Sequence, residues 1–423
     1  MSYTLYGQYK DSNIDWIKKI PIHWMPYKLK HVINEFIAGG TPKSSNDSYW
    51  DENNDGIPWV AIGDMNDNDY INSTAKNITI EGLASKNLRI LKKGTLIYSI
   101  FASLGKTSIL NIDATTNQAI LGLILSNKID TIYLKYYLVA LQTTISSFSN
   151  ENTQENLNLS IVKNMEIAIP ISLEEQKQIP KYLNKKTSKI DETIAKNKEL
   201  IKLLEEKRVT LINYVVTKGL NPDVPMKDSG IDIVGLIPKN NNIIRLKFLC
   251  DIKTGDKDTV NRNPEGKYPF YVRSPIIERI DTYSFEGEAV LMAGDGVGAG
   301  KVFHYANGKF DYHQRVYNLH NFKKVSPEFI YYYMSSLFSL EIEKGSAKST
   351  VDSVRLPMLE NFLICYPPIN EQENIVNYLN FKTSKIDNAI SKIEDNIKLL
   401  EEYKTSLIHH VVTGKIDVRG EEI

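Results

Sequence analysis

Two short strings of the sequence end like a nucleotide-binding loop, whose backbone N–H groups would surround a phosphate. Gly105-Lys106-Thr107 has the ending of a P-loop, but Ile100 stands where the first glycine of that loop is required. Gly300-Lys301 has Asp295 at that position and Val302 in place of Ser or Thr. Neither string therefore predicts a nucleotide site.

A run of alternating glycines leaves two interpretations open. Gly294, Gly296, Gly298 and Gly300 could cradle a phosphate through backbone N–H groups. More often, such a run is simply a flexible turn.

Other reaction centres are incomplete. The spacing of His304, His313 and His320 matches no metal motif, which favours surface or hydrogen-bonding histidines. Tyr366-Pro367-Pro368 lacks the polar residue and the following aromatic residue of the Asn/Asp-Pro-Pro-aromatic motif of amino-methyltransferases. Pro222-Asp223 lacks the acidic-x-Lys continuation of a nuclease. The sequence therefore indicates a protein without its own catalytic, metal or cofactor site.

Composition limits the class of protein. The 423 residues are enough for two or more domains, and the charged and apolar fractions are ordinary for a globular protein. The two cysteines, Cys250 and Cys365, lie far apart without His or Cys companions, which favours a reducing cytosol. No apolar run reaches the roughly 20 residues of a membrane span, and the net charge of zero argues against a general polycation.

The chain contains an internal duplication. Residues 173–217 and 369–413 align without a gap at a constant offset of 196, and 25 of the 45 aligned positions are identical. Both copies contain Thr-Ser-Lys-Ile-Asp, ending at Asp191 and Asp387, and both contain Ile-Lys-Leu-Leu-Glu-Glu. Such identity indicates a repeated structural unit.

Both copies predict a long helix with a heptad seam. At about 1.5 Å per residue, each helix would be roughly 65 Å long. Residues 173–217 carry a net charge of +3 and residues 369–413 carry −2, which favours pairing between the copies. The predicted coiled-coil seam consists of Leu183, Ile190, Ile194, Ile201, Leu204, Leu211, Leu379, Ile386, Ile390, Ile397, Leu400 and Leu407.

The start of the first helix contains a conflict. Ser172 is a suitable N-cap, with Glu175 as its capping-box partner. Pro180 would then lie beyond the first turn, which predicts either a kink or a later start of the helix.

The segment ahead of each variable region is duplicated as well. Lys10-Asp11-Ser12 recurs as Lys227-Asp228-Ser229 at an offset of 217. The second variable region must therefore be shorter by 21 residues, since the helices differ by 196. The linker at 218–227 contains one glycine and two prolines that end the first helix. This short connection predicts that the two helices pack antiparallel.

The variable regions predict an α+β fold. Residues 57–62, 96–100, 120–125 and 289–293 resemble short buried strands, and the Tyr-rich segments 133–141 and 329–334 resemble helices. The predicted boundaries are 1–165 for the first recognition domain, 166–222 for the first long helix, 223–362 for the second domain and 363–423 for the second helix.

The order of several strings resembles the specificity subunit of a Type I restriction–modification system. The strings of the first unit are Gly39-Gly40-Thr41-Pro42, Ile57-Pro58-Trp59, Gly105-Lys106, Thr115-Thr116-Asn117-Gln118-Ala119 and Leu173-Glu174-Glu175-Gln176 after Pro170. Those of the second unit are Gly266-Lys267-Tyr268-Pro269-Phe270, Gly294-Asp295-Gly296, Gly300-Lys301-Val302, His313-Gln314-Arg315 and Pro367-Pro368-Ile369-Asn370-Glu371-Gln372. Together with the duplication, they cover almost the whole chain.

This resemblance implies a non-catalytic, cytoplasmic subunit that binds double-stranded DNA. Two globular α/β target recognition domains would each read half of an asymmetric, bipartite DNA site. The two long helices would form an antiparallel coiled coil with internal pseudo-two-fold symmetry. Two methyltransferase subunits and restriction/translocase subunits would be partners, and they would bind S-adenosylmethionine, ATP and Mg.

Candidate base-reading residues lie in the turn-rich strings, because loops on a rigid scaffold often carry contacts. Arg can bind guanine and Asn or Gln can bind adenine in bidentate fashion; alternatively, each candidate is a solvated residue or a turn former. Gln118 and Gln314 could instead be internal supports, since similar strings recur in both units. The candidates are Thr41, Lys43, Ser44, Lys106, Asn117, Gln118, Thr153, Gln154, Asn156, Lys257, Arg262, Arg273, Lys301, Gln314, Arg315, Lys348 and Ser349.

Two other classes remain open. A stand-alone methyltransferase with fused recognition domains would need a donor-binding motif, which the sequence lacks. A coiled-coil adaptor that does not bind DNA agrees with the heptads but leaves two diverged domains unexplained.

Overall fold

The computed structural model describes residues 3–53, 55–65, 69–101, 103–142, 157–345 and 353–421. It divides into two compact units. Unit 1 contains Met1–Lys196 and Asn396–Ile423, and unit 2 contains Asn197–Asp395. Both boundaries fall inside long helices, so each unit contains one globular domain and part of each helix.

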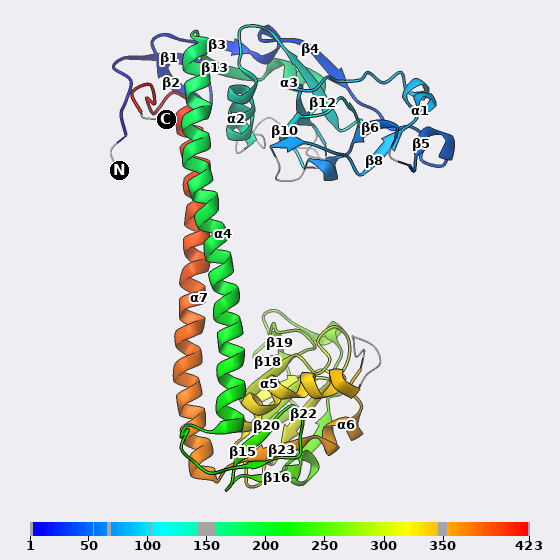
Figure 1. Ribbon diagram of the computed structural model, residues 1–423, viewed down its shortest axis with the longest axis vertical. Helices are drawn as coiled ribbons and strands as arrows, with labels where there is room; N and C mark the ends of the chain where they lie inside the picture. The colour runs from blue at the N-terminus through cyan, green and yellow to red at the C-terminus, as the bar shows by residue number, and fades with distance from the viewer. Residues whose placement is uncertain are drawn as a thin grey trace. The chain divides into compact units, whose positions relative to one another are not determined.

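The two long helices are α4 (Leu173–Lys218) and α7 (Ile369–Val412) (Figure 1). The expectation of a later start at Pro180 is wrong, because α4 begins at Leu173 and includes Pro180 in its interior. The Ser172 hydroxyl accepts a hydrogen bond from the Glu175 N–H (3.4 Å), as the predicted cap requires. Pro180 is buried. Packing of the first turns against the domain compensates for the missing N–H.

In unit 1, the beginning of α4 packs against the end of α7. Ile179 and Leu183 share a hydrophobic cluster with Leu407 and Val411. In unit 2, the end of α4 packs against the beginning of α7, where Ile212 and Val216 cluster with Ile375 and Leu379. The helices therefore run antiparallel in each unit, as predicted.

The predicted seam residues are all buried or half-buried. Within unit 1, Leu183, Ile190, Ile194 and Leu407 are buried, and Ile397 and Leu400 are half-buried. Within unit 2, Leu379 and Ile386 are buried, and Ile201, Leu204, Leu211 and Ile390 are half-buried.

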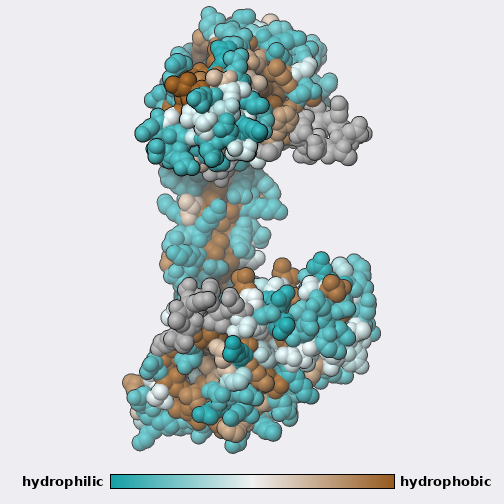
Figure 2. Space-filling model, turned by 90° about the vertical axis from the view of Figure 1, so that its right-hand side faces the viewer, coloured by the Kyte–Doolittle hydropathy of each residue, from teal (hydrophilic) through white to brown (hydrophobic). Residues whose placement is uncertain are grey.

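Other apolar side chains on the helices remain exposed, and brown side chains line part of the helical surface in Figure 2. By their exposed fractions, the exposed apolar residues of the helices include Leu203 and Val209 in unit 2 and Leu399 in unit 1. Single exposed apolar side chains of this kind are common on protein surfaces.

Within the part of unit 1 that the structure describes, the globular domain contains two main sheets. The five-stranded sheet has the order β4-β12-β9-β10-β7, and the four-stranded sheet has the order β11-β6-β8-β5. A short sheet pairs β13 with β3, and a hairpin pairs β1 with β2. The strands are β1 (Tyr9–Ile14), β2 (Ile17–Pro21), β3 (Trp24–Lys28), β4 (Ile33–Ala38), β5 (Trp50–Asp51), β6 (Ile57–Val60), β7 (Tyr70–Ile71), β8 (Lys76–Ile78), β9 (Leu96–Ser99), β10 (Thr107–Leu110), β11 (Thr115–Thr116), β12 (Ile120–Leu125) and β13 (Glu166–Pro170).

The described residues of this domain include three further α-helices, namely α1 (Ile80–Ser85), α2 (Thr131–Leu141) and α3 (Leu159–Asn164). The Tyr-rich α2 is almost completely buried, which explains why its sequence lacks a polar face. Asp130 caps it by accepting hydrogen bonds from the N–H groups of Ile132 and Tyr133 at 2.9 and 3.0 Å.

The domain of unit 2 is built on one six-stranded sheet of order β17-β22-β20-β21-β18-β19. Two short sheets pair β14 with β15 and β16 with β23. The elements are β14 (Met226–Asp228), β15 (Leu236–Pro238), β16 (Asn242–Arg245), β17 (Asp251–Thr254), β18 (Tyr268–Tyr271), β19 (Glu278–Ile280), β20 (Phe285–Ala293), β21 (Phe303–Tyr312), β22 (Val316–His320), β23 (Leu363–Tyr366), α5 (Pro327–Gly345) and α6 (Leu356–Asn361). Mixed sheets with helices in both domains confirm the α+β class.

Among the described residues, none of the helices combines the length and the apolar character needed to cross a membrane. Cys250 and Cys365 are both free and buried.

Candidate nucleic-acid interface

The two domains place a glutamine-bearing turn at equivalent points of their sheets. In unit 1, β11 pairs in parallel with β6, and Gln118 follows two residues after β11. In unit 2, the end of β21 pairs in parallel with β18, and Gln314 follows two residues after β21. The two glutamines differ by 196 in number, like the helices, so this turn belongs to the duplicated frame.

A second loop lies against each of these turns. A Cβ on Gly39 would lie 2.2 Å from the Asn117 carbonyl oxygen, and one on Gly255 would lie 2.8 Å from the His313 carbonyl oxygen and 2.0 Å from that of Tyr312. Only glycine allows the backbones to approach so closely. The sequence after each glycine is therefore held beside the turn.

In unit 1, these loops bring Thr41 and Gln118 together. The Thr41 hydroxyl donates a hydrogen bond to Oε1 of Gln118, and Gln118 is exposed. Lys43 and Ser44 are exposed in the same loop as Thr41. Two tryptophan side chains hydrogen-bond to the backbone of this loop. The Trp59 indole N–H donates to the Gly40 carbonyl at 2.9 Å, and the Trp50 indole N–H donates to the Lys43 carbonyl at 3.3 Å.

Two other unit 1 candidates occupy different environments. Asn117 is buried, and its Oδ1 accepts a hydrogen bond from the Ala119 N–H at 3.0 Å, which is a structural role. Lys106 lies in the separate turn between β9 and β10, where its N–H donates to the Ser99 hydroxyl at 2.9 Å. Thr153, Gln154 and Asn156 lie outside the described residues.

In unit 2, Gln314 is exposed and joins the loop that contains Lys257. Its N–H donates to the Lys257 carbonyl at 2.7 Å, and its side-chain Nε2 donates to Asp258 at 2.7 Å. Gln118 and Gln314 thus connect two loops at the surface, whereas an internal support would be buried.

A charged cluster extends from this turn. Nη1 of Arg273 donates to Asp295 at 3.1 Å, and Nε of Arg315 lies 3.6 Å from the other oxygen of Asp295. The Arg315 N–H donates to Nδ1 of His313 at 3.0 Å. Burial lowers the pKa of His313, with the two guanidiniums contributing, so His313 is neutral near pH 7.

The remaining unit 2 candidates do not join the cluster. Arg262 forms a separate ion pair with Glu278 at 3.5 Å, and Lys301 is exposed in the loop after β20. Lys348 and Ser349 lie outside the described residues. Our sequence interpretation missed Asp295, Asp258 and His313 as site residues, although Gly294-Asp295-Gly296 and His313-Gln314-Arg315 were both visible as strings.

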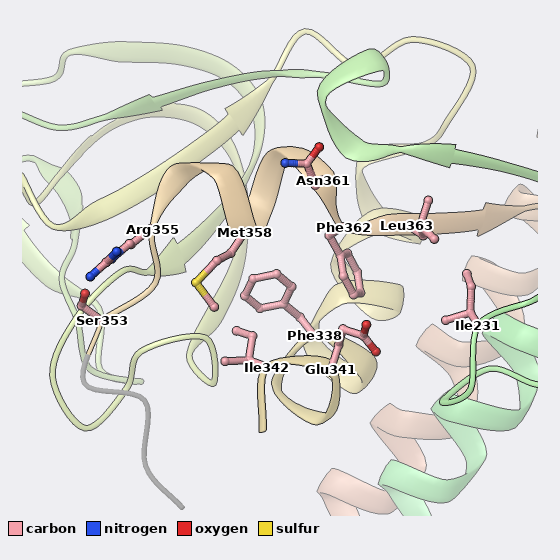
Figure 3. Close-up of a pocket in the computed structure, with 10 residues that line it drawn as sticks. All are labelled: Ile231, Phe338, Glu341, Ile342, Ser353, Arg355, Met358, Asn361, Phe362 and Leu363. Carbon is pink, nitrogen blue, oxygen red and sulfur yellow. The ribbon is translucent and has the colours of Figure 1, made fainter. Parts of the chain in front are cut away.

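A cavity of about 650 Å³ in unit 2 is lined in part by Ser353, whose backbone forms an isolated β-bridge with Asp295. Phe338, Ile342 and Met358 converge in it from α5 and α6 (Figure 3). Phe338 and Phe362 meet edge to face, with ring centroids 5.0 Å apart, and both belong to the hydrophobic core. The other lining residues are Ile231, Glu341, Arg355, Asn361 and Leu363. We assign this cavity to the packing of α6 on α5.

Comparisons with known proteins agree with this architecture. The Type I restriction modification DNA specificity domain matches residues 21–206 and 238–401. Two solved structures share the fold. A chain from work on complex assembly and conformational transition of the type I R-M system has a TM-score of 0.73 at 16% identity, covering 94% of this chain and 99% of that one. The HsdS subunit from Thermoanaerobacter tengcongensis has a TM-score of 0.53 at 16% identity, with coverage of 97% and 100%.

Two relatives come from Methanocaldococcus jannaschii. The MjaIX specificity subunit is 31% identical over 204 residues, which is 47% of this chain and 44% of the relative. The MjaVIII specificity subunit is 25% identical over 450 residues, which is 97% of this chain and 98% of the relative. Because the domain model matches twice and covers most of the sequence, the chain belongs to the family of Type I restriction modification DNA specificity domains.

Proposed function

We propose that this protein is the DNA-reading specificity subunit of a Type I restriction–modification system. Each unit would read one half of an asymmetric, two-part DNA sequence. The observation that carries this proposal is the equivalent placement of exposed polar loops on two diverged domains. Thr41 and Gln118 form this surface in unit 1, and Lys257, Gln314 and Arg315 form it in unit 2.

The charge distribution supports a protein that needs partners to hold DNA tightly. Residues 1–172 have a net charge of −1 and residues 231–368 have +1. Phosphate contacts by basic residues usually dominate DNA affinity. The subunit should therefore bind DNA weakly alone and more strongly when partner subunits enclose the duplex.

Two methyltransferase subunits and the restriction/translocase subunits are the proposed partners. We place the docking of the methyltransferase subunits on α4 and α7, whose exposed apolar side chains include Leu203 and Leu399. S-adenosylmethionine, ATP and Mg would bind to these partners, and this chain would be non-catalytic. The family match supports this interpretation rather than a coiled-coil adaptor.

The test is methylome sequencing of a host that expresses the methyltransferase partner with and without this gene. We expect one split, asymmetric methylated motif to appear only when the gene is present. Exchanging residues 14–165 for those of another family member should change one half of the motif and leave the other half intact. An unchanged methylome, with the methyltransferase shown to be active, would refute the proposal.

A further inference from the structure

The charged cluster of unit 2 differs from an ordinary surface ion pair because one carboxylate pairs with two arginines. Asp295 lies between two arginines and contacts each with a different carboxylate oxygen. The side chain of Asp295 is 26% exposed, whereas those of Arg273 and Arg315 are 45% and 65% exposed. A guanidinium has five N–H donors, so both arginines keep donors directed to solvent.

The glycine loop after β20 fixes this arrangement. A Cβ on Gly294 would lie 2.9 Å from the Arg315 carbonyl oxygen, and one on Gly298 would lie 2.5 Å from the Arg273 carbonyl oxygen. The Gly294 N–H also donates to the Arg315 carbonyl at 2.8 Å. The loop therefore packs against the backbone of both arginines, with Asp295 between them. Its glycines position the carboxylate through close backbone contacts.

A second carboxylate, Asp258, lies 3.8 Å from His313 Nε2 and accepts a hydrogen bond from the Gln314 amide. The major-groove edge of a G·C pair presents two acceptors on guanine, N7 and O6, and one donor on cytosine, N4. Arginine donors beside carboxylate acceptors are complementary to that edge.

We propose that Arg273 and Arg315 read a G·C base pair in the half-site bound by unit 2, with Asp295 as their positioning residue. This inference rests on the proposed function, since it requires that unit 2 reads DNA. Beyond the proposed function, the inference specifies one base pair of the half-site and the residues that select it.

The cluster favours a base edge over a phosphate. Asp295 places a negative charge between the two arginines, and this charge would repel the phosphate backbone. The same carboxylate can orient a guanidinium for a bidentate contact, which is the most common specific contact to guanine. A guanidinium can also bind a phosphate in bidentate fashion, so the neighbouring carboxylate, and not the shape of the guanidinium, distinguishes the two targets.

The first experiment is methylome sequencing of hosts that carry the methyltransferase partner and variants of this gene. The half-site of unit 2 is the half that stays constant when residues 14–165 are exchanged. We expect this half to contain a G·C pair whose selection falls on the order of 10-fold or more in Arg273→Ala, Arg315→Ala and Asp295→Asn. Arg315→Lys should also reduce the selectivity for this G·C pair, because lysine keeps the positive charge but lacks the paired N–H donors of the guanidinium.

Arg245→Ala is the matched control, because Arg245 is an exposed arginine on β16 of the same domain and is not among the candidate base-reading residues. It should leave the motif unchanged. Co-purification with the methyltransferase and an unchanged melting temperature would establish that each variant is folded.

A second measurement changes the DNA instead of the protein. Replacing the selected guanine with 7-deazaguanine removes the N7 acceptor. It should weaken binding of the assembled wild-type complex about 10-fold and have little effect on the Arg273→Ala, Arg315→Ala double variant.

Several outcomes would overturn the inference. A uniform loss of methylation without a change of motif would assign the arginines to phosphate contacts. An unchanged motif in folded Arg273 and Arg315 variants, or a constant half without any G·C pair, would exclude the guanine assignment while leaving a split motif and the proposed function intact. If the wild-type gene directs no split motif, the proposed function itself fails.

Discussion

Arg208 forms an ion pair with Asp387 across the two long helices of unit 2, with Nε 3.0 Å from Oδ1. In unit 1, Lys404 donates to Asp191 at 2.6 Å. Asp191 and Asp387 are copies of each other, and so are Arg208 and Lys404. The same acid–base pair therefore joins the helices in both units, with the basic residue contributed by α4 in one and by α7 in the other. This exchange of roles is the signature of an antiparallel duplicated frame.

Reversing one of these charges should weaken the helix pairing modestly. Asp387→Arg is expected to lower the free energy of unfolding by about 0.5–1 kcal/mol, because the pair is partly exposed. The double variant Arg208→Asp, Asp387→Arg should recover most of this loss. Urea denaturation would measure both, with the exposed Glu394→Lys as control. A double variant no more stable than the single variant would contradict an ion-pair contribution.

Replacing either of two buried glutamines should destabilise its own unit. Gln176 accepts from the Asp130 N–H at 2.8 Å and donates to the carbonyls of Lys128 and Pro170 at 3.0 and 2.8 Å. Gln372 makes the equivalent three bonds, to Ser326, Lys324 and Pro367, at 2.8, 3.1 and 2.8 Å. We expect Gln176→Glu and Gln372→Glu each to cost about 2–4 kcal/mol, because a carboxylate cannot donate to the two carbonyls.

Thermal unfolding would measure the effect of these glutamine variants. Gln178→Glu makes the same chemical change at a half-buried position of the same helix and is the matched control for Gln176→Glu. Equal melting temperatures for the glutamine variants and the wild type would show that the three bonds contribute little.

Glu175 should be far more important to stability than its copy Glu371. The carboxylate of Glu175 accepts hydrogen bonds from the Tyr6 hydroxyl at 2.9 Å and the Trp24 indole at 3.0 Å, and His23 Nε2 lies 2.9 Å away. Burial, together with Glu175, raises the pKa of Tyr6 well above its ordinary value. Glu175→Ala leaves these buried donors unpaired and should cost about 2–4 kcal/mol.

Glu371 is only half-buried, and we expect Glu371→Ala to cost less than about 1 kcal/mol. Chemical denaturation of the two alanine variants side by side would measure the difference. A similar loss for both would mean that the network around Glu175 is not responsible.

His409 should make stability depend on pH in the mildly acidic range. Burial, with Lys415 and His410 nearby, lowers the pKa of His409 from 6.5 to about 4. Because the folded pKa lies below the unfolded one, the unfolded state binds a proton first as the pH falls. The contribution of His409 is therefore complete above about pH 6.5 and is lost progressively towards about pH 4.

The free energy of unfolding should fall between pH 7 and pH 5 in the wild type. In His409→Asn this fall should be smaller by on the order of 1 kcal/mol, a figure that allows for the partial exposure of His409. Unfolding curves at both pH values would measure this, with the exposed His31→Asn as control. The same pH dependence in the His409 variant and the wild type would assign the acid sensitivity to other groups.

The sequence alone determined the duplicated arrangement of this protein, with a variable domain ahead of each long helix. The constant offset of 196 and the heptads predicted two long antiparallel helices, because a repeated apolar seam must be buried and the two copies complement each other. Short β-rich strings predicted the α+β domains, and the variable regions began and ended where the duplication did. These features depend on local periodicity and on comparison of the chain with itself.

Only the tertiary structure decided which polar residues meet. Arg273, Asp295 and Arg315 are separated by about twenty residues at each step, and the packing of the glycine loop against two backbones brings them together. Asn117 carries the same amide group as a glutamine, yet it is buried and bonded to its own turn. Pro180 stays inside α4 because the domain packs around it. Such outcomes depend on contacts between distant segments, whose energies are not contained in local sequence patterns.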